Sequence, residues 1–578
     1  MNTPPLKDNA FPAQPLEKIA LSCSGGGYRA TSFHLGSMSY LNRLSYNEKP
    51  LLENVKLIST VSGGSITGVV YALYKQRNKS FEYIYHLLLD KLAKLDLIVI
   101  GIEKLNPGAK WANRNKTKNL INAFAEQYEQ FTDGETFSVF NTMTSHLENV
   151  VFNSTEFTNA INFRFKNPQA GYSGNTIIKV VKDQLAEVKL SDVMASSSCF
   201  PGGFEPLLWP DDYRHEDSPV LKHLSDRYRA EKVKNIGIMD GGIYDNQGIE
   251  SILNYKKGNE LPYFDLVIIS DVASPYMDAY QPHKPQPKTG FRTYTLNEAR
   301  KKINSVNNRV NIVFIILLLT FGTFAAFTNY PPLYQGIFIG LFTGFLVFFI
   351  VKIMLVRRLQ RIKSYVVNAI KDLVPPFYRE KLSHLKIGEL SVHRAEPLLF
   401  SRLNSLVTLL VHVFLKVVRR LNYDKLYEDR RYTYRRISNL INELTEKDFK
   451  RKAEQAADVP GTAPKANMFF NGPYEQVVGE QIKMVAEDAA AFGTTLWFTD
   501  QQKLDNALAK LVATGQFTMC YNMIKYLENL MFTPESGFEL LDVEVKQKLH
   551  TLYQQCTADF EHFRLDPFFL HRELENKM

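Results

Sequence analysis

The stretch that decides the fold is residues 18–29, KIALSCSGGGYR, in which a short apolar run breaks into three glycines and then into a helical pattern. Residues 55–65, VKLISTVSGGS, repeat this order of features. Each segment is typical of a strand, a tight turn and a helix. Such a turn leaves unpaired backbone N–H groups at the amino end of the helix, where the helix dipole also favours negative charge. We therefore expect an α/β fold, with a central sheet and helices on both of its faces.

The first turn contains three consecutive glycines, Gly25, Gly26 and Gly27. An anion can come close to the backbone here, because no side chain blocks its approach. We expect the N–H groups of this turn, the glycine loop, to form an oxyanion hole.

The second turn places Ser62 between a strand and a helix. An elbow of this kind pushes the hydroxyl out of the sheet and needs small neighbours, which Gly63 and Gly64 provide. Thr60 stands where such elbows usually have their first glycine. On this segment alone two interpretations remain, since a serine that caps a helix after a strand has the same appearance.

A carboxylate follows a third apolar run, residues 236–239, and precedes two glycines. At the end of a strand, Asp240 could accept the proton of Ser62. The alternative is an Asx-turn that closes the strand. A triad in the order serine, acid, histidine would need His283 or a later histidine, and none of these lies in a recognisable turn. We therefore prefer a dyad of Ser62 and Asp240.

Three motifs in this order resemble those of the patatin-like phospholipases: SGGGYR at 24–29, TVSGGS at 60–65 and MDGG at 239–242. The resemblance extends to residues 151–165, 190–206 and 494–521, and it covers 15–290 and 480–540 in all. It implies a three-layer α/β sandwich with a central, mostly parallel sheet. It also implies hydrolysis of fatty-acyl esters of phospholipids or lysophospholipids, with no metal and no cofactor.

The resemblance also assigns roles to single residues. Ser62 would be the nucleophile and Asp240 its general base, without a histidine. The oxyanion donors would be Gly25, Gly26 and Gly27. Arg29 would bind a lipid phosphate or, alternatively, pair with a carboxylate across the elbow.

The sequence departs from the family pattern at three positions. Thr60 replaces a glycine, Ser24 stands where an aspartate is frequent, and Ala30 stands where a glycine is common. Two other functions remain open, and the altered elbow at Thr60 supports only the first of them. One is a membrane-bound lipid sensor or scaffold without turnover, and the other is a triggered effector that degrades membranes in bacterial defence.

The composition of the 578-residue chain is that of a globular protein with several domains. Its four cysteines show no C-x-x-C pair, which argues against a zinc site or a disulfide framework and favours a reducing compartment. The formal net charge is +9, and arginines crowd the region after a long hydrophobic block. Because no nucleic-acid-binding motif accompanies them, we expect membrane phospholipids as partners and no nucleic acid.

The hydrophobic block, residues 310–351, contains no charged residue and no histidine. Its apolar halves, 312–328 and 333–351, would span roughly 26 and 28 Å as helices, close to the thickness of a bilayer core. Basic residues flank both ends, so we expect both ends on the cytoplasmic side. This predicts a multi-pass protein of a bacterial inner membrane with its catalytic domain in the cytoplasm. The alternative is a helical hairpin buried in a soluble oligomer.

Three glycines of the second span, Gly336, Gly340 and Gly344, lie on one helical face. A face of this kind packs either against the first span or between the protomers of a homo-oligomer.

The pattern along the chain predicts five segments. These are an N-terminal extension (1–14), the first part of a catalytic domain (15–290), an inserted membrane module with a basic helical region (291–465), the closing part of the catalytic domain (466–545) and a C-terminal helical tail (546–578).

Overall fold

A computed structural model of the chain describes residues 11–12, 14–111, 117–257, 262–273, 287–326, 331–373, 387–409, 413–457, 469–470, 472–533 and 536–577. The chain divides into two compact units. Unit 1 comprises residues 1–277 and 412–578, and unit 2 comprises residues 278–411.

Unit 1 is built on a ten-stranded mixed sheet in the order β12-β11-β1-β4-β5-β6-β7-β8, in which β10 pairs with β5 and β9. The strands from β12 to β5 in this order are parallel, whereas β6 to β10 add antiparallel pairs. The strands of this sheet are β1 (Ile19–Cys23), β4 (Val55–Val61), β5 (Asn149–Glu156), β6 (Ile161–Lys166), β7 (Ser173–Gly174), β8 (Lys179–Val180), β9 (Leu207–Trp209), β10 (Ile236–Asp240), β11 (Leu266–Asp271) and β12 (Arg436–Leu440). A separate hairpin consists of β2 (Ser45–Tyr46) and β3 (Lys49–Pro50).

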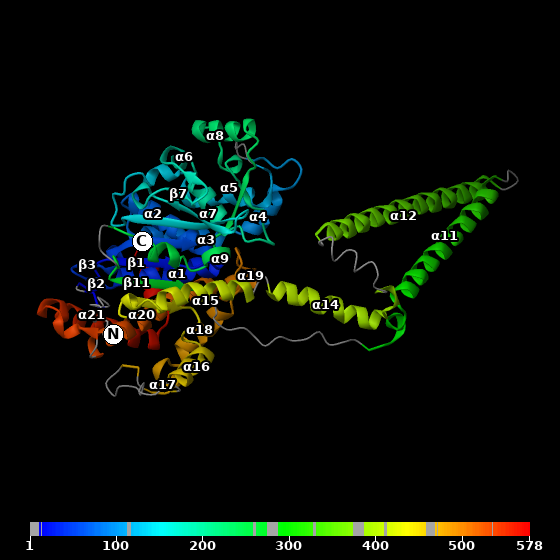
Figure 1. The fold of residues 1–578 in the computed structure, drawn as a ribbon. Helices are drawn as coiled ribbons and strands as arrows, with labels where there is room; N and C mark the ends of the chain where they lie inside the picture. The colour runs from blue at the N-terminus through cyan, green and yellow to red at the C-terminus, as the bar shows by residue number, and fades with distance from the viewer. Residues whose placement is uncertain are drawn as a thin grey trace, which may run out of the picture. The chain divides into compact units, whose positions relative to one another are not determined.

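Helices cover both faces of this sheet (Figure 1). The helices of unit 1 are α1 (Gly27–Arg43), α2 (Gly63–Gln76), α3 (Phe81–Lys94), α4 (Leu97–Lys104), α5 (Leu120–Thr132), α6 (Lys182–Ala186), α7 (Leu190–Ser198), α8 (Pro219–Ala230), α9 (Gly242–Asp245), α10 (Ile249–Leu253), α15 (Phe414–Tyr427), α16 (Glu446–Ala457), α17 (Tyr474–Val477), α18 (Glu480–Ala491), α19 (Asp500–Leu504), α20 (Ala507–Phe532), α21 (Val543–Leu565) and α22 (Phe569–Glu575).

Successive side chains of the central strands enter two different cores, because strand residues alternate between the faces of a sheet. In β11, Leu266 and Ile268 belong to the main core, whereas Val267 and Ile269 belong to a second, smaller one. Helices α10 and α15 supply apolar side chains to that second core. The expected three-layer α/β fold is thus confirmed.

Helix α1, which begins at the glycine loop, packs closely against α20. A Cβ atom added at Gly36 would lie 1.9 Å from the carbonyl oxygen of Val512, and one added at Gly515 would lie 2.1 Å from that of Phe33. The two backbones therefore touch, which is possible because both positions are glycine. This contact holds the C-terminal part of the chain beside the helix that carries the glycine loop.

The division into units differs from the one expected from the sequence. Residues 412–457 were assigned to the inserted module, but α15 and β12 belong to unit 1, where β12 pairs with β11. The strand was missed because one of its inward-facing residues is the polar Asn439, which is buried and donates to the Ser37 hydroxyl (2.9 Å). The expected boundary between the inserted module and the closing part, at residues 465 and 466, lies outside the described residues.

Unit 2 contains the long helices α11 (Leu296–Ala326) and α12 (Pro332–Leu373), followed by α14 (Val392–Thr408). Helices α11 and α12 form an antiparallel hairpin, since the ring of Phe314 stacks on Phe348 (5.5 Å between centroids) and that of Phe324 on Phe338 (5.2 Å). Both helices are long and apolar enough to cross a membrane, over 296–326 and 332–362. They extend beyond the two apolar halves recognised in the sequence. Residues 327–330, which include the end of the first apolar half and the start of the expected connection (329–332), lie outside the described residues.

The glycine face of α12 is open in this hairpin. A Cβ atom added at Gly336, Gly340 or Gly344 would meet no described atom within 4 Å. The face therefore does not serve the packing of α12 on α11 in the described structure. Its use between protomers stays a prediction.

Candidate active site

One edge of β5 is shared by two strands, and this arrangement brings two distant motifs together. Val61, at the end of β4, pairs with Asn153. Asp240, at the end of β10, pairs with the next residue, Ser154. Because β4 and β10 reach the same edge from opposite directions, their carboxyl ends meet there. Ser62 follows β4 directly, so it lies beside Asp240.

Ser62 occupies a strained backbone conformation, with φ 50° and ψ −122°. A non-glycine residue in this region costs on the order of 1–3 kcal/mol and persists only where its surroundings hold it. Ser197 of α7 contributes to this support: its hydroxyl accepts a hydrogen bond from the Ser62 N–H (2.9 Å) and donates one to the carbonyl of Asn153 (2.7 Å). Ser197 lies in a block recognised in the sequence, but no role was foreseen for it.

The Asp240 carboxylate is buried, and the N–H of Gly242 donates to its Oδ1 (2.6 Å). Burial raises the pKa of Asp240 from 3.8 to about 6, although the N–H of Gly242 and the Ser62 side chain act in the opposite direction. The arrangement thus places a half-buried hydroxyl beside a carboxylate that is more basic than usual.

The glycine loop lies against the elbow through backbone contacts. A Cβ atom added at Gly63 would lie 2.1 Å from the carbonyl oxygen of Gly27, and one added at Gly64 would lie 2.4 Å from that of Cys23. The two turns can approach this closely because both lack side chains at the contact. The glycine loop and the hydroxyl of Ser62 are therefore parts of one site.

The three amide groups of the glycine loop are not equivalent. The N–H of Gly25 donates to the carbonyl of Asn246 (3.0 Å), which corrects the expectation that all three are available to an oxyanion. Gly26 and Gly27 are the N-cap and first residue of α1, where a helix offers amide groups no internal partner. The sequence gives no signal for the role of Asn246, because its contact with Gly25 joins segments far apart in the chain.

The C-terminal part of the chain also reaches the glycine loop. The N–H of Tyr28 donates to the carbonyl of Thr495 (2.8 Å), and a Cβ atom added at Gly27 would lie 2.3 Å from the same oxygen. The segment around Thr495 was recognised as a closing block of the domain. Its backbone restrains the start of α1.

Arg29 is mostly buried behind the loop. Its Nη1 donates to the carbonyl of Phe492 (2.7 Å), so this part of the guanidinium is bound to backbone. Burial lowers the pKa of Arg29 to about 10, while the charge of Asp271 partly offsets the effect. Binding of a lipid phosphate by Arg29 stays a prediction.

The departures from the family motifs are accommodated by local packing. Thr60 bonds through its hydroxyl to Ser65 (2.9 Å), and its methyl group occupies space that a Cβ atom at Gly68 would need (2.3 Å). The Ser24 hydroxyl accepts a hydrogen bond from the N–H of Val272 (3.1 Å). Both residues therefore fit the elbow and the loop as they stand.

A buried histidine lies close to the glycine loop, but its ring nitrogens contact groups other than Ser62 and Asp240. His34 contacts the Ser270 hydroxyl through Nδ1 (2.8 Å) and the carbonyl of Ser24 through Nε2 (2.9 Å). Burial lowers the pKa of His34 to about 4, so the ring is neutral at physiological pH. His283 lies outside the described residues.

The raised pKa of Asp240 predicts a pH-dependent gain in stability for Asp240→Asn. The folded state holds the proton more tightly than the unfolded state, so wild-type stability falls as pH rises from about 4 to about 6. At pH 8 the buried carboxylate costs about 3 kcal/mol, which the neutral amide removes. Thermal unfolding should show a higher Tm for the variant at pH 8 and a smaller difference at pH 4. An equal difference at both pH values would contradict this reading.

Comparison with known proteins supports the family that the motifs indicate. Residues 21–253 match the family model of patatin-like phospholipases. No curated protein matches the chain. The matched region contains the glycine loop, the Ser62 elbow, the shared edge of β5 and Asp240. The chain therefore carries a patatin-like phospholipase domain over residues 21–253, which supports a lipid acyl hydrolase activity in the broad sense.

Proposed function

We propose that the protein is a membrane-bound serine hydrolase that cleaves fatty-acyl esters of phospholipids or lysophospholipids through a dyad of Ser62 and Asp240. The observation that carries the proposal is the placement of the Ser62 elbow beside the buried Asp240 carboxylate, where β4 and β10 end at the same edge of β5. The strained elbow and the adjacent glycine loop support it.

In the first half of the reaction, Asp240 takes the proton of the Ser62 hydroxyl while Oγ forms a bond to the acyl carbonyl carbon. The negative charge then develops on the carbonyl oxygen, where the N–H groups of Gly26 and Gly27 stabilise it. When the tetrahedral intermediate collapses, the ester bond breaks and Asp240 returns the proton to the leaving alcohol. Ser62 is left as an acyl ester.

In the second half, water replaces the alcohol. Asp240 accepts a proton from the water, whose oxygen attacks the acyl-enzyme, and the proton returns to Oγ as the fatty acid leaves. A pKa of about 6 suits Asp240 to both directions of proton transfer, because it lies nearer the operating pH than the pKa of an ordinary carboxyl group. No histidine is required by this scheme.

The proposal is tested with vesicles of phosphatidylethanolamine and phosphatidylglycerol. Wild-type protein should release free fatty acid and lysophospholipid, and Ser62→Ala should lower the rate at least about 10³-fold because it removes the nucleophile. Quantifying both products by mass spectrometry also shows which ester is cleaved.

The matched control is Ser154→Ala. Ser154 pairs with Asp240 in the sheet, and its buried hydroxyl has no hydrogen-bond partner among the described residues. This variant should keep activity within about twofold of wild type. Equal hydrolysis by wild type and Ser62→Ala would refute the assignment of the nucleophile.

The catalytic proposal is compatible with Thr60 at the elbow, which is the feature that favours the non-catalytic alternative. Thr60 packs against Gly68, and the backbone N–H of Ser62 keeps its hydrogen bond to Ser197. A triggered effector in bacterial defence would use the same chemistry as the proposed hydrolase.

We also propose that α11 and α12 insert the protein into a bacterial inner membrane, with both ends of the hairpin and the catalytic domain in the cytoplasm. Two helices of sufficient length and apolarity support this topology, as do the basic residues on either side of the charge-free stretch 310–351, among them Arg300 in α11 and Arg358 in α12. The open face of Gly336, Gly340 and Gly344 would then be available to a second protomer within the bilayer.

This topology predicts the labelling of single introduced cysteines. Tyr334→Cys lies near the turn of the hairpin and should react with an impermeant maleimide in intact spheroplasts. Arg300→Cys should react only after permeabilisation. The four native cysteines are buried and should give little background. Labelling of position 300 in intact spheroplasts would contradict the orientation.

A further inference from the structure

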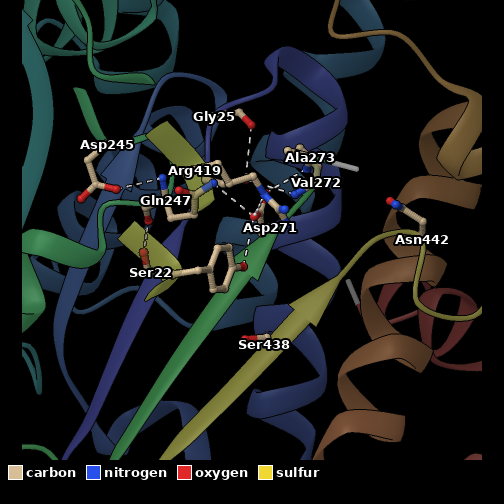
Figure 2. A network of polar contacts seen from close by, with 12 residues as sticks. Ser22, Gly25, Asp245, Gln247, Asp271, Val272, Ala273, Arg419, Ser438 and Asn442 are labelled. Carbon is tan, nitrogen blue, oxygen red and sulfur yellow. Dashed lines mark hydrogen bonds and ion pairs between the residues drawn. The ribbon is translucent and has the colours of Figure 1, made fainter. Parts of the chain in front are cut away.

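A buried ion pair joins the end of β11 to α15. Arg419 Nε donates to Asp271 Oδ2 (2.8 Å), and the Tyr423 hydroxyl donates to the same oxygen (3.1 Å). The two charged side chains are 9 % and 0 % exposed. Figure 2 shows Arg419 directed at Asp271 beside the residues around Gly25 and Gln247.

Each charge of this pair depends on the other. Burial by itself would raise the pKa of Asp271, but the charge of Arg419 and the N–H of Ala273 bring it below its usual value. Asp271 in turn keeps the pKa of Arg419 above its usual value despite burial. Removing one partner of such a pair leaves an uncompensated buried charge, which is strongly destabilising locally.

The neighbours of Asp271 hold the glycine loop. Ser24 donates its N–H to the carbonyl of Ser270 (3.0 Å) and accepts the N–H of Val272 through its hydroxyl (3.1 Å). A Cβ atom added at Gly26 would lie 2.5 Å from Cγ2 of Val272. The residues on either side of Asp271 thus contact the loop that carries the proposed oxyanion donors.

Asp271 also contacts the turn that follows Asp240, residues 241–248, which we call the aspartate turn. Gln247 Nε2 donates to Asp271 Oδ2 (3.3 Å), and the Gln247 N–H donates to Asp245 (3.2 Å). Asn246, which lies between Asp245 and Gln247 in the sequence, accepts a hydrogen bond from the N–H of Gly25 through its carbonyl group. The Asp271 carboxylate therefore lies where the glycine loop and the aspartate turn meet (Figure 2).

Helix α15 reaches the aspartate turn directly as well. Asn422 Nδ2 donates to the carbonyl of Tyr244 (3.4 Å) in α9. Along the chain, β11 precedes unit 2 and α15 follows it, so the two partners of the ion pair stand on either side of that unit in the sequence.

We propose that Arg419 is a positioning residue, which through Asp271 holds the glycine loop and the turn after Asp240 in the geometry needed for hydrolysis. The inference rests on the proposed function for its kinetic consequence. Arg419 acts through its partners, since its hydrogen bond goes to Asp271 and not to Ser62 or Asp240. A displacement of about 1 Å in such a site can lower the rate on the order of 10²-fold.

The chain offers a matched control in a second buried arginine. Arg435 lies 3.7 Å from Asp265, with the two side chains 7 % and 14 % exposed. Asp265 precedes β11, whereas Asp271 ends it, so this pair lies at the opposite end of the same strand. Arg435 also comes from the segment that follows unit 2. Its loss should reduce stability without disturbing the glycine loop.

The experiment compares full-length Arg419→Met, Arg419→Lys and Arg435→Met with wild type. Hydrolysis of p-nitrophenyl butyrate gives kcat and KM, and thermal unfolding gives Tm. Both methionine variants should lower Tm, but only Arg419→Met should reduce kcat at least about tenfold, with KM within about twofold. Arg419→Lys keeps the charge and should recover part of kcat. Equal losses of kcat in the two methionine variants would overturn the proposal.

Hydrogen exchange provides a readout that does not depend on hydrolysis. Peptides covering 22–28 and 244–248 should exchange faster in Arg419→Met than in Arg435→Met, with Arg419→Lys in between. If Arg419→Met does not fold, the comparison of Arg419→Lys with Arg435→Met decides the question. Unchanged protection of both segments in Arg419→Met would refute the positioning role, even if the wild-type protein hydrolyses lipid. If the wild-type protein is inactive but both segments exchange faster in Arg419→Met, the positioning role stands and only the proposed function is refuted.

Discussion

The backbone contact between the glycine loop and the Ser62 elbow is the constraint on which the site depends. The contact leaves no space for a Cβ atom at Gly63 or Gly64, because the carbonyl oxygens of Gly27 and Cys23 would lie within 2.4 Å of it. Two strand-turn-helix units can therefore lie side by side with their amide groups near one hydroxyl. A helix terminus of this kind stabilises negative charge where it develops, at the carbonyl oxygen of a bound ester.

The second constraint is topological. The edge of β5 accepts β4 over Asn149–Asn153 and β10 over Ser154–Glu156, so a parallel and an antiparallel strand end at the same point. This arrangement buries Asp240 next to Ser62 and raises its pKa to about 6. In the proposed dyad, burial supplies the basicity that a histidine supplies in serine hydrolases with a catalytic triad. The same burial reduces stability at neutral pH, as is usual where function requires an unfavourable environment for a charged group.

The sequence was informative wherever a feature is local. Glycines at 25–27 and 63–64 identify two turns, and an aspartate before two glycines identifies the third, because turn geometry restricts residue type at each position. The three-layer fold and the apolar helices of the insertion followed from similar local patterns. The family resemblance then joined the three motifs into one expected site.

Features that depend on contacts between distant segments could not be predicted. The N–H of Gly25 is bound to Asn246, which removes it from the oxyanion donors. Strand β12 was not predicted because it contains a buried asparagine, Asn439, whose hydrogen-bond partner Ser37 lies some four hundred residues away in the sequence. The ion pair of Arg419 and Asp271 likewise joins residues separated by the whole insertion, and arginines in this basic region were expected at a lipid surface.

The most direct test of the account is to locate the adduct of a fluorophosphonate probe by peptide mass spectrometry. The account predicts a single modified residue, Ser62, with much slower labelling in Asp240→Asn because the hydroxyl loses its base. Labelling at another serine, or a labelling rate at Ser62 that is unchanged in Asp240→Asn, would contradict the proposed dyad.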